Sequence, residues 1–381
     1  MLSRLCRLLL LGLALSGCGE KEHSPAFIAD GNPPKLSDWG MFRLSRGHLA
    51  PQARVVSYDL ATPLFSDYAA KLRTVWMPEG AAARYDETKA FDFPVGTVIT
   101  KTFYYPKGQA KGQQDRLRTY ESAAPLGADG LDLSSVRLIE TRLLVRRETG
   151  WQVFPYVWTD KQDEAVLSRT GANLDLTLEQ ASGEPVRFTY AVPNANQCAS
   201  CHTPDFSSKA IAPIGLKARH LNHLFPYAQG PENQLDHLTR IGYLTGAVPS
   251  AQAPHVADWR DSGASVQDRA RAYLDINCGH CHSATGLART TGLHLDWGTG
   301  DPRRLGLCKP PTAAGPGTGG HSFDIVPGQP DQSIMPFRLA STSPGIRMPE
   351  LGRSLAHAEG TALIRQWIEA WTGRCDLSDS Q

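Results

Sequence analysis

Residues 91–105, FDFPVGTVITKTFYY, are dense in β-branched and aromatic side chains and contain one proline and one glycine. This composition favours extended strands, and the proline and the glycine mark a turn. Two further strand-like runs, 136–146 and 151–158, lie on either side of Glu148-Thr-Gly150, which is typical of a hairpin. The sequence therefore predicts that this part of the chain forms a β-sheet.

A second hairpin is predicted closer to the middle of the chain. Leucines alternate with polar residues over 174–178, apolar residues alternate over 186–192, and Ser182-Gly-Glu184 lies between the two runs. Such alternation gives each strand one buried face. Several short strands separated by turns at this spacing are typical of a sandwich. We therefore expect an all-β, sandwich-like domain over 36–192.

The pattern changes to helical spacing after Pro193. Ser265 and Asp268 form a capping-box pattern before apolar residues at helical spacing. Residues 356–372 repeat large apolar side chains on one helical face. The predicted fold class is multidomain β + α, with a mostly α-helical region after the β domain, divided into 193–260 and 261–381.

Composition bounds the functional classes. The chain has 381 residues, a formal net charge of +1 at pH 7 and 41% hydrophobic residues. This hydrophobic share is typical of a folded globular protein, and a near-zero charge gives no reason to expect a nucleic-acid partner. No run of 18 apolar residues is present, so no membrane-spanning helix is predicted.

The N-terminus has the features of an export signal. Arg4 and Arg7 precede a short apolar run, and Leu15-Ser-Gly-Cys18 resembles a bacterial lipobox. We expect a signal peptide at 1–17, lipidation of Cys18 and a tether at 18–35; the alternative is a plain secretory signal with a chance cysteine. Because Gly19 rather than Asp follows, analogy with bacterial lipoproteins favours a periplasm-facing anchor in the outer rather than the inner membrane.

Eight cysteines are present, and export favours an oxidising compartment. Cys6 lies in the signal, Cys18 is the lipidation site, and four others form two tight pairs. Cys308 and Cys375 remain, and we expect them to form a disulfide. The alternative is two unrelated buried thiols.

The two pairs carry the chemistry of the chain. Cys198-Ala-Ser-Cys201-His202 and Cys278-Gly-His-Cys281-His282 are both C-x-x-C-H, the attachment pattern of c-type haem. Two cysteines one helical turn apart can each form a thioether with a haem vinyl group, and the adjacent histidine can bind the iron. Zinc sites, thioredoxin-like pairs and structural disulfides are weaker alternatives, because zinc pairs usually lie closer together and no βαβ setting is evident. The predicted cofactors are two haem c groups.

The sixth coordination position of each iron is either filled by a side chain or open. For the second haem, Met348 lies beside a proline shortly before the last helix and is the first choice; Met335 is the second. For the first haem no methionine lies between His202 and the second motif, so His237 is the first choice and His220 the second. An open site and a ligand from the β domain remain alternatives. His280, inside the second motif, is expected to face solvent.

Several stretches together resemble a largely uncharacterised family of exported dihaem c-type cytochromes of Gram-negative bacteria. They are the lipobox, Tyr58-Asp-Leu-Ala-Thr-Pro-Leu-Phe-Ser-Asp-Tyr68, Phe91-Asp-Phe-Pro-Val-Gly-Thr97 and the two C-x-x-C-H motifs. The C-terminal stretch 326–352 is also similar to bacterial cytochrome c-like domains. The resemblance implies one haem at Cys198, Cys201 and His202, and another at Cys278, Cys281, His282 and Met348. It also implies an exported parallel β-helix protein as a partner, and it supplies no substrate.

The expected function is electron transfer to and from redox proteins. We expect a lipid-anchored electron-transfer protein more than an enzyme that turns over a substrate. One alternative is a dihaem peroxidase-type oxidoreductase with an open sixth site on the first haem. Another is a partner- or glycan-binding β module whose haems report redox state.

Overall fold

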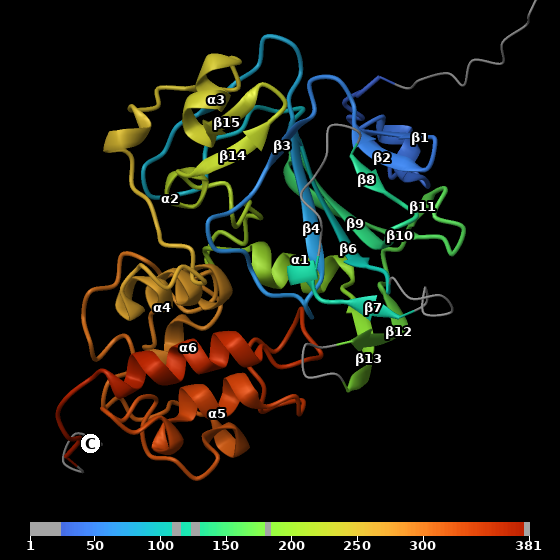
Figure 1. The fold of residues 1–381 in the computed structure, drawn as a ribbon. Coiled ribbons are helices and arrows are strands. Elements are labelled where there is room, and N and C mark those ends of the chain that lie inside the picture. Colours follow the sequence, from blue (N-terminus) through green and yellow to red (C-terminus); the bar gives the residue numbers. More distant parts are fainter. Residues whose placement is uncertain (1–23, 109–115, 123–129, 180–183, 377–381) are drawn as a thin grey trace, which may run out of the picture.

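The computed structural model describes residues 24–108, 116–122, 130–179 and 184–376. Of these described residues, 28% lie in strands and 21% in helices. The largest element is a six-stranded antiparallel sheet in the order β11-β10-β9-β6-β4-β3 (Figure 1). Its strands are β3 (Val56–Tyr58), β4 (Ala70–Trp76), β6 (Val98–Pro106), β9 (Val136–Arg147), β10 (Gly150–Trp158) and β11 (Ala165–Leu167).

Smaller sheets surround it. One contains β1 (Phe42–Ser45), β2 (His48–Pro51) and β8 (Leu131–Asp132); another contains β13 (Pro185–Val192), β12 (Ala172–Glu179) and β7 (Leu117–Arg118). There are also two two-stranded sheets. One pairs β14 (Leu224–Tyr227) with β15 (Gly230–Asn233), and the other pairs β16 (Leu244–Thr245) with β5 (Ala83–Arg84). The hairpins predicted around residues 148–150 and 182–184 correspond to the antiparallel pairs β9–β10 and β12–β13.

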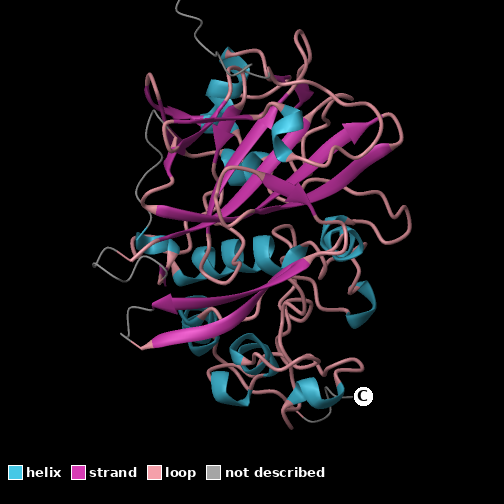
Figure 2. Ribbon diagram, turned by 90° about the vertical axis from the view of Figure 1, so that its right-hand side faces the viewer, coloured by secondary structure: helices cyan, strands magenta, loops and turns pink. Residues whose placement is uncertain are grey.

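The helices lie mostly in the second half of the chain. They are α1 (Ala195–His202), α2 (Ala218–Leu221), α3 (Gln234–Arg240), α4 (Val266–Leu274), α5 (Ile334–Ala340) and α6 (Ala358–Glu369). Single-turn helices are η1 (Leu36–Trp39), η2 (Tyr120–Ser122), η3 (Ser250–Gln252), η5 (Arg289–Thr291), η6 (Gly315–Thr318) and η7 (Pro330–Gln332), and α4 continues into the π-helix η4 (Asp275–Gly279). Figure 2 shows the strands of the large sheet as an upper layer, with most helices below it.

The predicted fold class is wrong for the second half of the chain. The region after Pro193 is not mostly α-helical and does not support a helical cytochrome c-like domain: its helices are short, its connections are long, and it contributes β14, β15 and β16. The physical reason lies in the glycine- and proline-rich connections, such as 310–320, which cannot continue a helix. The strong helical periodicity of α4 and α6 does not extend to the residues between them.

The two faces of the large sheet belong to different cores. One face, with Trp76 and Leu143, packs on the N-terminal segment around Trp39. The opposite face, with Val75 and Ile99, packs on the segment after Pro193; the buried residues of that segment in this core are Leu216, Ala218, Leu221, Leu235, Leu238, Tyr243, Leu244, Ala253 and Ile276. Residues 193–260 therefore share a core with the β-sheet. The helices α4, α5 and α6 form a separate cluster.

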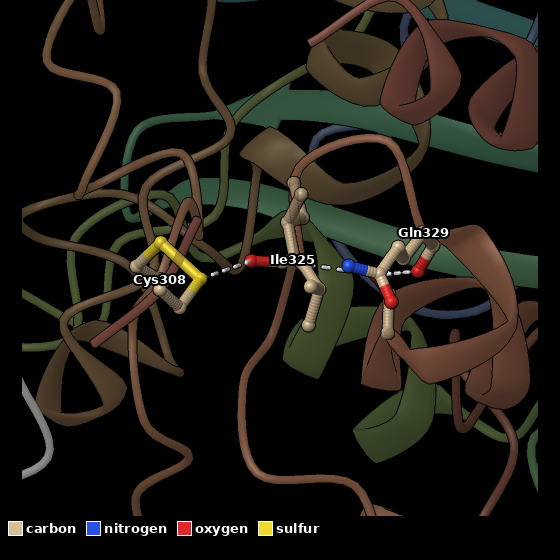
Figure 3. The surroundings of a disulfide bond; sticks show 6 residues. Cys308, Ile325 and Gln329 are labelled. Carbon is tan, nitrogen blue, oxygen red and sulfur yellow. Dashed lines mark hydrogen bonds between the residues drawn. A yellow bond between two sulfur atoms is a disulfide. The ribbon is translucent and has the colours of Figure 1, made fainter. Parts of the chain in front are cut away.

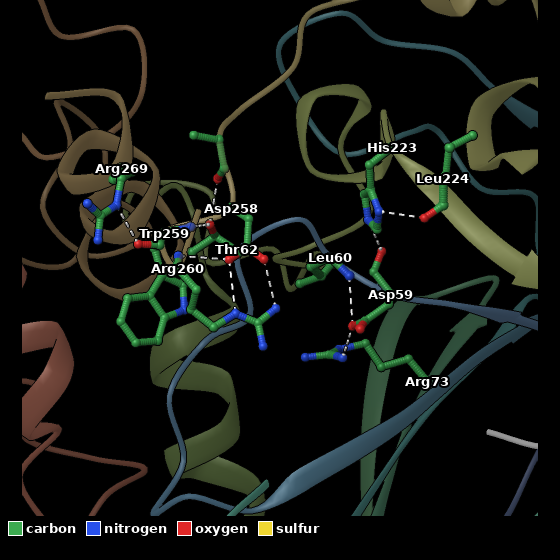
Figure 4. Close-up of polar contacts among 11 residues, drawn as sticks. Asp59, Leu60, Thr62, Arg73, His223, Leu224, Asp258, Trp259, Arg260 and Arg269 are labelled. Carbon is green, nitrogen blue, oxygen red and sulfur yellow. Dashed lines mark hydrogen bonds and ion pairs between the residues drawn. The ribbon is translucent and has the colours of Figure 1, made fainter. Parts of the chain in front are cut away.

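The connection between β3 and β4 joins these parts. Thr62 Oγ1 donates to the carbonyl of Ala257 at 2.7 Å and accepts from the backbone N–H of Trp259 at 3.0 Å (Figure 4). The backbone N–H of Phe65 donates to Asn277 Oδ1 at 2.8 Å. This connection is therefore bonded both to the segment before α4 and to the segment that carries the second motif.

No helix among the residues that the structure describes has the length and apolar character to cross a bilayer. The predicted signal peptide and Cys18 lie outside the described residues.

Candidate haem sites

The first motif is presented by a capped helix. Asn194 Oδ1 accepts from the backbone N–H of Gln197 at 2.9 Å, and Gln197 Oε1 accepts from the backbone N–H of Asn194 at 2.9 Å, so both side chains fix the start of α1. Cys198 and Cys201 lie one turn apart on this helix, and both thiols are free. The helix ends at His202. Local sequence therefore places two thiols and an imidazole in the arrangement that haem attachment requires.

His202 is oriented for metal binding. Its Nδ1 lies 2.9 Å from the carbonyl oxygen of Ala212, and a carbonyl can only accept, so Nδ1 carries the proton. Burial lowers the pKa of His202 to about 3, and the imidazole is neutral at physiological pH. The lone pair is therefore on Nε2, as in metal-ligating histidines whose other nitrogen donates to a backbone carbonyl.

The second motif lies where α4 passes into the π-helix η4. The backbone N–H groups of Cys281 and His282 both donate to the carbonyl of Cys278, at 3.1 and 2.9 Å, which keeps the motif in one compact turn. Burial lowers the pKa of His282 to about 4, so this imidazole is also neutral. Gly279 is required for close packing, because a Cβ atom there would lie 2.8 Å from the Cα of Asp296.

Each motif lines its own cavity. The first cavity, of about 1380 Å³ with part of the space open to solvent, is bounded by Cys198, Cys201 and His202 and by strands of the large sheet. The second, of about 1680 Å³ on the same measure, is bounded by Cys278, Cys281 and His282.

The two cavities adjoin. They share the lining residues Cys201, Asn277, His280, Leu339, Met348, Pro349 and Leu351. Two hydrogen bonds also join the two motif regions: the backbone N–H of Phe206 donates to the carbonyl of Thr285 at 2.8 Å, and the side-chain Oγ1 of Thr285 donates to the carbonyl of Pro204 at 2.9 Å. The arrangement holds two attachment motifs side by side. The residues present fit two haem groups: each cavity has two free thiols and a neutral imidazole on its wall.

Both candidate methionines line the second cavity, but their settings differ. Met335 lies on α5 and belongs to the core between α4, α5 and α6. Met348 lies in the loop before α6 and lines both cavities. Its backbone carbonyl accepts from Arg353 Nη2 at 2.7 Å, and its N–H donates to the carbonyl of Arg338 at 3.0 Å. The loop that carries Met348 is therefore fixed although its side chain is not part of the core.

His237 and His220, the two predicted choices for the sixth ligand of the first haem, line neither of these two cavities. His237 stacks on Tyr227 at 3.4 Å between ring centroids, and its Nδ1 lies 2.7 Å from Glu232 Oε2. His220 is fully buried with its Nε2 3.0 Å from Asp275 Oδ2. Their places on apolar helix faces indicate burial, and both are buried, but burial alone does not place a side chain beside a cavity.

Two other histidines line the first cavity. His280 lines both cavities, so the expectation that it faces solvent is wrong. His357 immediately precedes α6; its Nδ1 lies 3.0 Å from the hydroxyl of Tyr273, and its ring stacks on Phe65 at 4.2 Å. Burial lowers the pKa of His357 to about 3. From the sequence, the position of His280 inside the second motif is the one signal that it could lie near a cavity. His357 reaches the first cavity through tertiary packing, which the sequence does not reveal.

The remaining cysteines form a disulfide. Cys308 and Cys375 are joined with sulfur atoms 2.13 Å apart, and the sulfur of Cys375 contacts the carbonyl oxygen of Ile325 at 3.9 Å (Figure 3). This bond links the chain end after α6 to the wall segment around Lys309 of the second cavity.

Among the described residues, no three His, Cys, Asp or Glu side chains gather as a site for a bare metal ion. Comparison of the chain with family models, curated proteins and solved structures finds no match.

Proposed function

We propose that the protein is an exported dihaem c-type cytochrome that transfers electrons between redox partners. The observation that carries the proposal is the shared wall of the two cavities, each of which contains a complete C-x-x-C-H motif. Electron transfer slows steeply with distance, so adjoining sites favour transfer within one chain.

The roles of the motif residues follow from their chemistry. The four thiols form thioether bonds, and His202 and His282 each provide an Nε2 atom to an iron. Haem bound in this way supplies a one-electron Fe(III)/Fe(II) couple whose potential depends on axial ligation and burial. The carbonyl of Ala212 holds His202 in the tautomer that this role requires.

Met348 is the proposed sixth ligand of the second iron. Met335 already packs among apolar core residues, and removing it from that core would cost contacts. Met348 has a fixed backbone and a side chain free to face the cavity. A thioether ligand gives a higher reduction potential than a second imidazole.

For the first iron, the imidazoles of His280 and His357 are the proposed sources of a sixth ligand. Both line the first cavity, and both are neutral, since burial lowers the pKa of His280 to about 4 and that of His357 to about 3. A neutral imidazole is the form that binds a metal.

The lipobox supports attachment of the protein to a membrane through Cys18, facing the periplasm, with the outer membrane favoured. The partners are redox proteins, and the exported parallel β-helix protein remains a proposal that rests on the family resemblance alone.

Intact mass of the denatured protein, expressed together with a haem-maturation system, tests the proposal. We expect a mass increase of two haems for the wild type and of one haem for Cys198→Ala/Cys201→Ala and for Cys278→Ala/Cys281→Ala. The matched control Cys308→Ala/Cys375→Ala also removes two cysteines but keeps both haems. A wild-type chain without covalent haem, made under maturation conditions that load another cytochrome c, would overturn the proposal.

A further inference from the structure

Three basic residues lie directly opposite one another on neighbouring strands. Arg73 of β4 pairs with Lys101 of β6, and Lys101 pairs with Arg142 of β9. Paired residues of adjacent strands point to the same face, so the three cations form one row, which we call the basic row. All three line the first cavity. Like charges directly opposite one another destabilise a sheet, so such a row inside a protein calls for an anion.

The carboxylates near the basic row do not pair with all of these cations. Arg73 pairs with Asp59 (Figure 4), and Arg142 pairs with Glu140, with 2.7 Å between Arg142 Nε and Glu140 Oε2. Lys101 has no hydrogen bond or ion pair with any described residue. Its neighbour on the same face, Lys71, donates only to the carbonyl of Ala69, at 3.1 Å.

The surroundings of Lys101 add no acceptor. Its Nζ lies 5.2 Å from the centroid of the Phe103 ring, and Arg142 and Lys71 lie over the same ring at 4.3 and 5.7 Å. An aromatic face attracts cations but accepts no conventional hydrogen bond. Burial, reinforced by Arg142 and Arg73 and opposed by Glu140, lowers the pKa of Lys101 to about 7.

A smaller opening connects this region to the surface. It encloses about 700 Å³, part of it open to solvent, and Lys71, Arg73 and Arg260 contribute to its lining. It shares Leu64, Phe65, Arg73 and His357 with the first cavity. Its lining also includes Asp59, the partner of Arg73, so the opening carries both signs of charge beside the basic row.

We propose that the basic row is a carboxylate-binding site in the wall of the first cavity, with Lys101 as its central donor. The carboxylate has two possible sources: a propionate of haem attached at Cys198 and Cys201, or a small carboxylate that enters from solvent. The first source rests on the proposed function, whereas the second does not.

The test compares wild type, Lys101→Met, Lys101→Arg and the surface control Lys161→Met at pH 6, where the Lys101 ammonium is charged. Spectroelectrochemical titration gives the midpoint potential of each haem, and calorimetry with succinate tests a free carboxylate. Thermal unfolding checks that each variant is folded, and Lys101→Arg restores the charge if methionine disturbs packing.

If a propionate is the source, Lys101→Met lowers one midpoint potential, because a nearby cation disfavours the more positive oxidised state. Lys101→Arg then restores it, Lys161→Met leaves it unchanged, and no protein binds succinate. If a free carboxylate is the source, the wild type binds succinate saturably and Lys101→Met does not. Unchanged potentials together with no succinate binding overturn the proposal. A wild type that carries no haem refutes the proposed function instead, and calorimetry then decides alone whether the site exists.

Discussion

The carboxylate of Asp67 accepts a hydrogen bond from the backbone N–H of Leu355, with 2.7 Å between Oδ1 and N. The same oxygen accepts from the N–H of Ser354 at 2.7 Å. Asp67 precedes β4 of the large sheet, whereas Ser354 and Leu355 lie between Met348 and α6. One buried side chain thus anchors the loop of a proposed iron ligand to the sheet that carries the basic row.

Asp67 makes stability depend on pH. Burial raises the pKa of Asp67 from its ordinary 3.8 to about 6, although the two N–H groups oppose the shift. Because the folded-state pKa is the higher one, the ionised folded form is penalised: the contribution of Asp67 to stability is greatest below about pH 4 and is lost as the pH rises through about 6. The loss is of the order of 3 kcal/mol.

Asp67→Asn is expected to remove this contribution, so that its stability relative to the wild type rises between pH 4 and 6, because its Oδ1 can still accept from both N–H groups and it carries no charge. Denaturant unfolding at several pH values between 4 and 7 measures the effect. The control Asp160→Asn, whose parent carboxylate is fully exposed, should retain the wild-type slope. An unaltered slope in Asp67→Asn would show that another group titrates.

Met348→Ala is expected to remove the sixth ligand of the second iron. The midpoint potential of that haem should fall, and its iron should become able to bind added imidazole, since the thioether no longer competes. Met335→Leu is the matched control and should retain the potential at a stability cost below about 1.5 kcal/mol. If the spectrum of the second haem changes in Met335→Leu and stays as in the wild type in Met348→Ala, then Met335 and not Met348 is the sixth ligand.

If His280 or His357 is the sixth ligand of the first iron, replacing both would leave that iron without a second imidazole. The double variant His280→Ala/His357→Ala should show a high-spin first haem by visible and electron paramagnetic resonance spectra. The single variants identify which ring binds, and His237→Ala should resemble the wild type because His237 lies outside the cavities.

A first haem that remains low-spin in the double variant would place the ligand elsewhere. A wild-type protein whose first haem is already high-spin and turns over hydrogen peroxide rapidly would favour the peroxidase-type alternative over simple electron transfer.

Gly279→Ala is expected to disturb the second motif. The new Cβ would lie 2.8 Å from the Cα and 3.1 Å from the N of Asp296, so backbone must move, at about 1–3 kcal/mol. Intact mass should show reduced haem at Cys278 and Cys281, with the first motif unaffected. Gly300→Ala is the control, because nothing lies within 4 Å of its added Cβ.

Local patterns could be predicted from the sequence, and tertiary neighbours could not. The hairpin around Glu148 and the capped start of α4 at Ser265 depend on adjacent residues, and both are present. The C-x-x-C-H spacing is equally local. By contrast, Lys101 occupies an ordinary strand position, and only sheet register places it between Arg73 and Arg142.

The histidines show the same limit. An apolar helix face indicates that His220 is buried, but it does not show that Asp275 is its partner or that His357 lies on the cavity wall. The helical prediction failed because the periodicity of α4 and α6 was extended to connections rich in glycine and proline.

The wall formed by Cys201, His280 and Met348 belongs to both cavities. If each cavity holds a redox centre, adding an electron to one makes adding an electron to the other less favourable, because little screening material separates them. Neither centre then has a single intrinsic potential. A redox titration of the protein requires four microscopic states and an interaction energy, and a substitution in the shared wall changes that interaction energy together with both potentials.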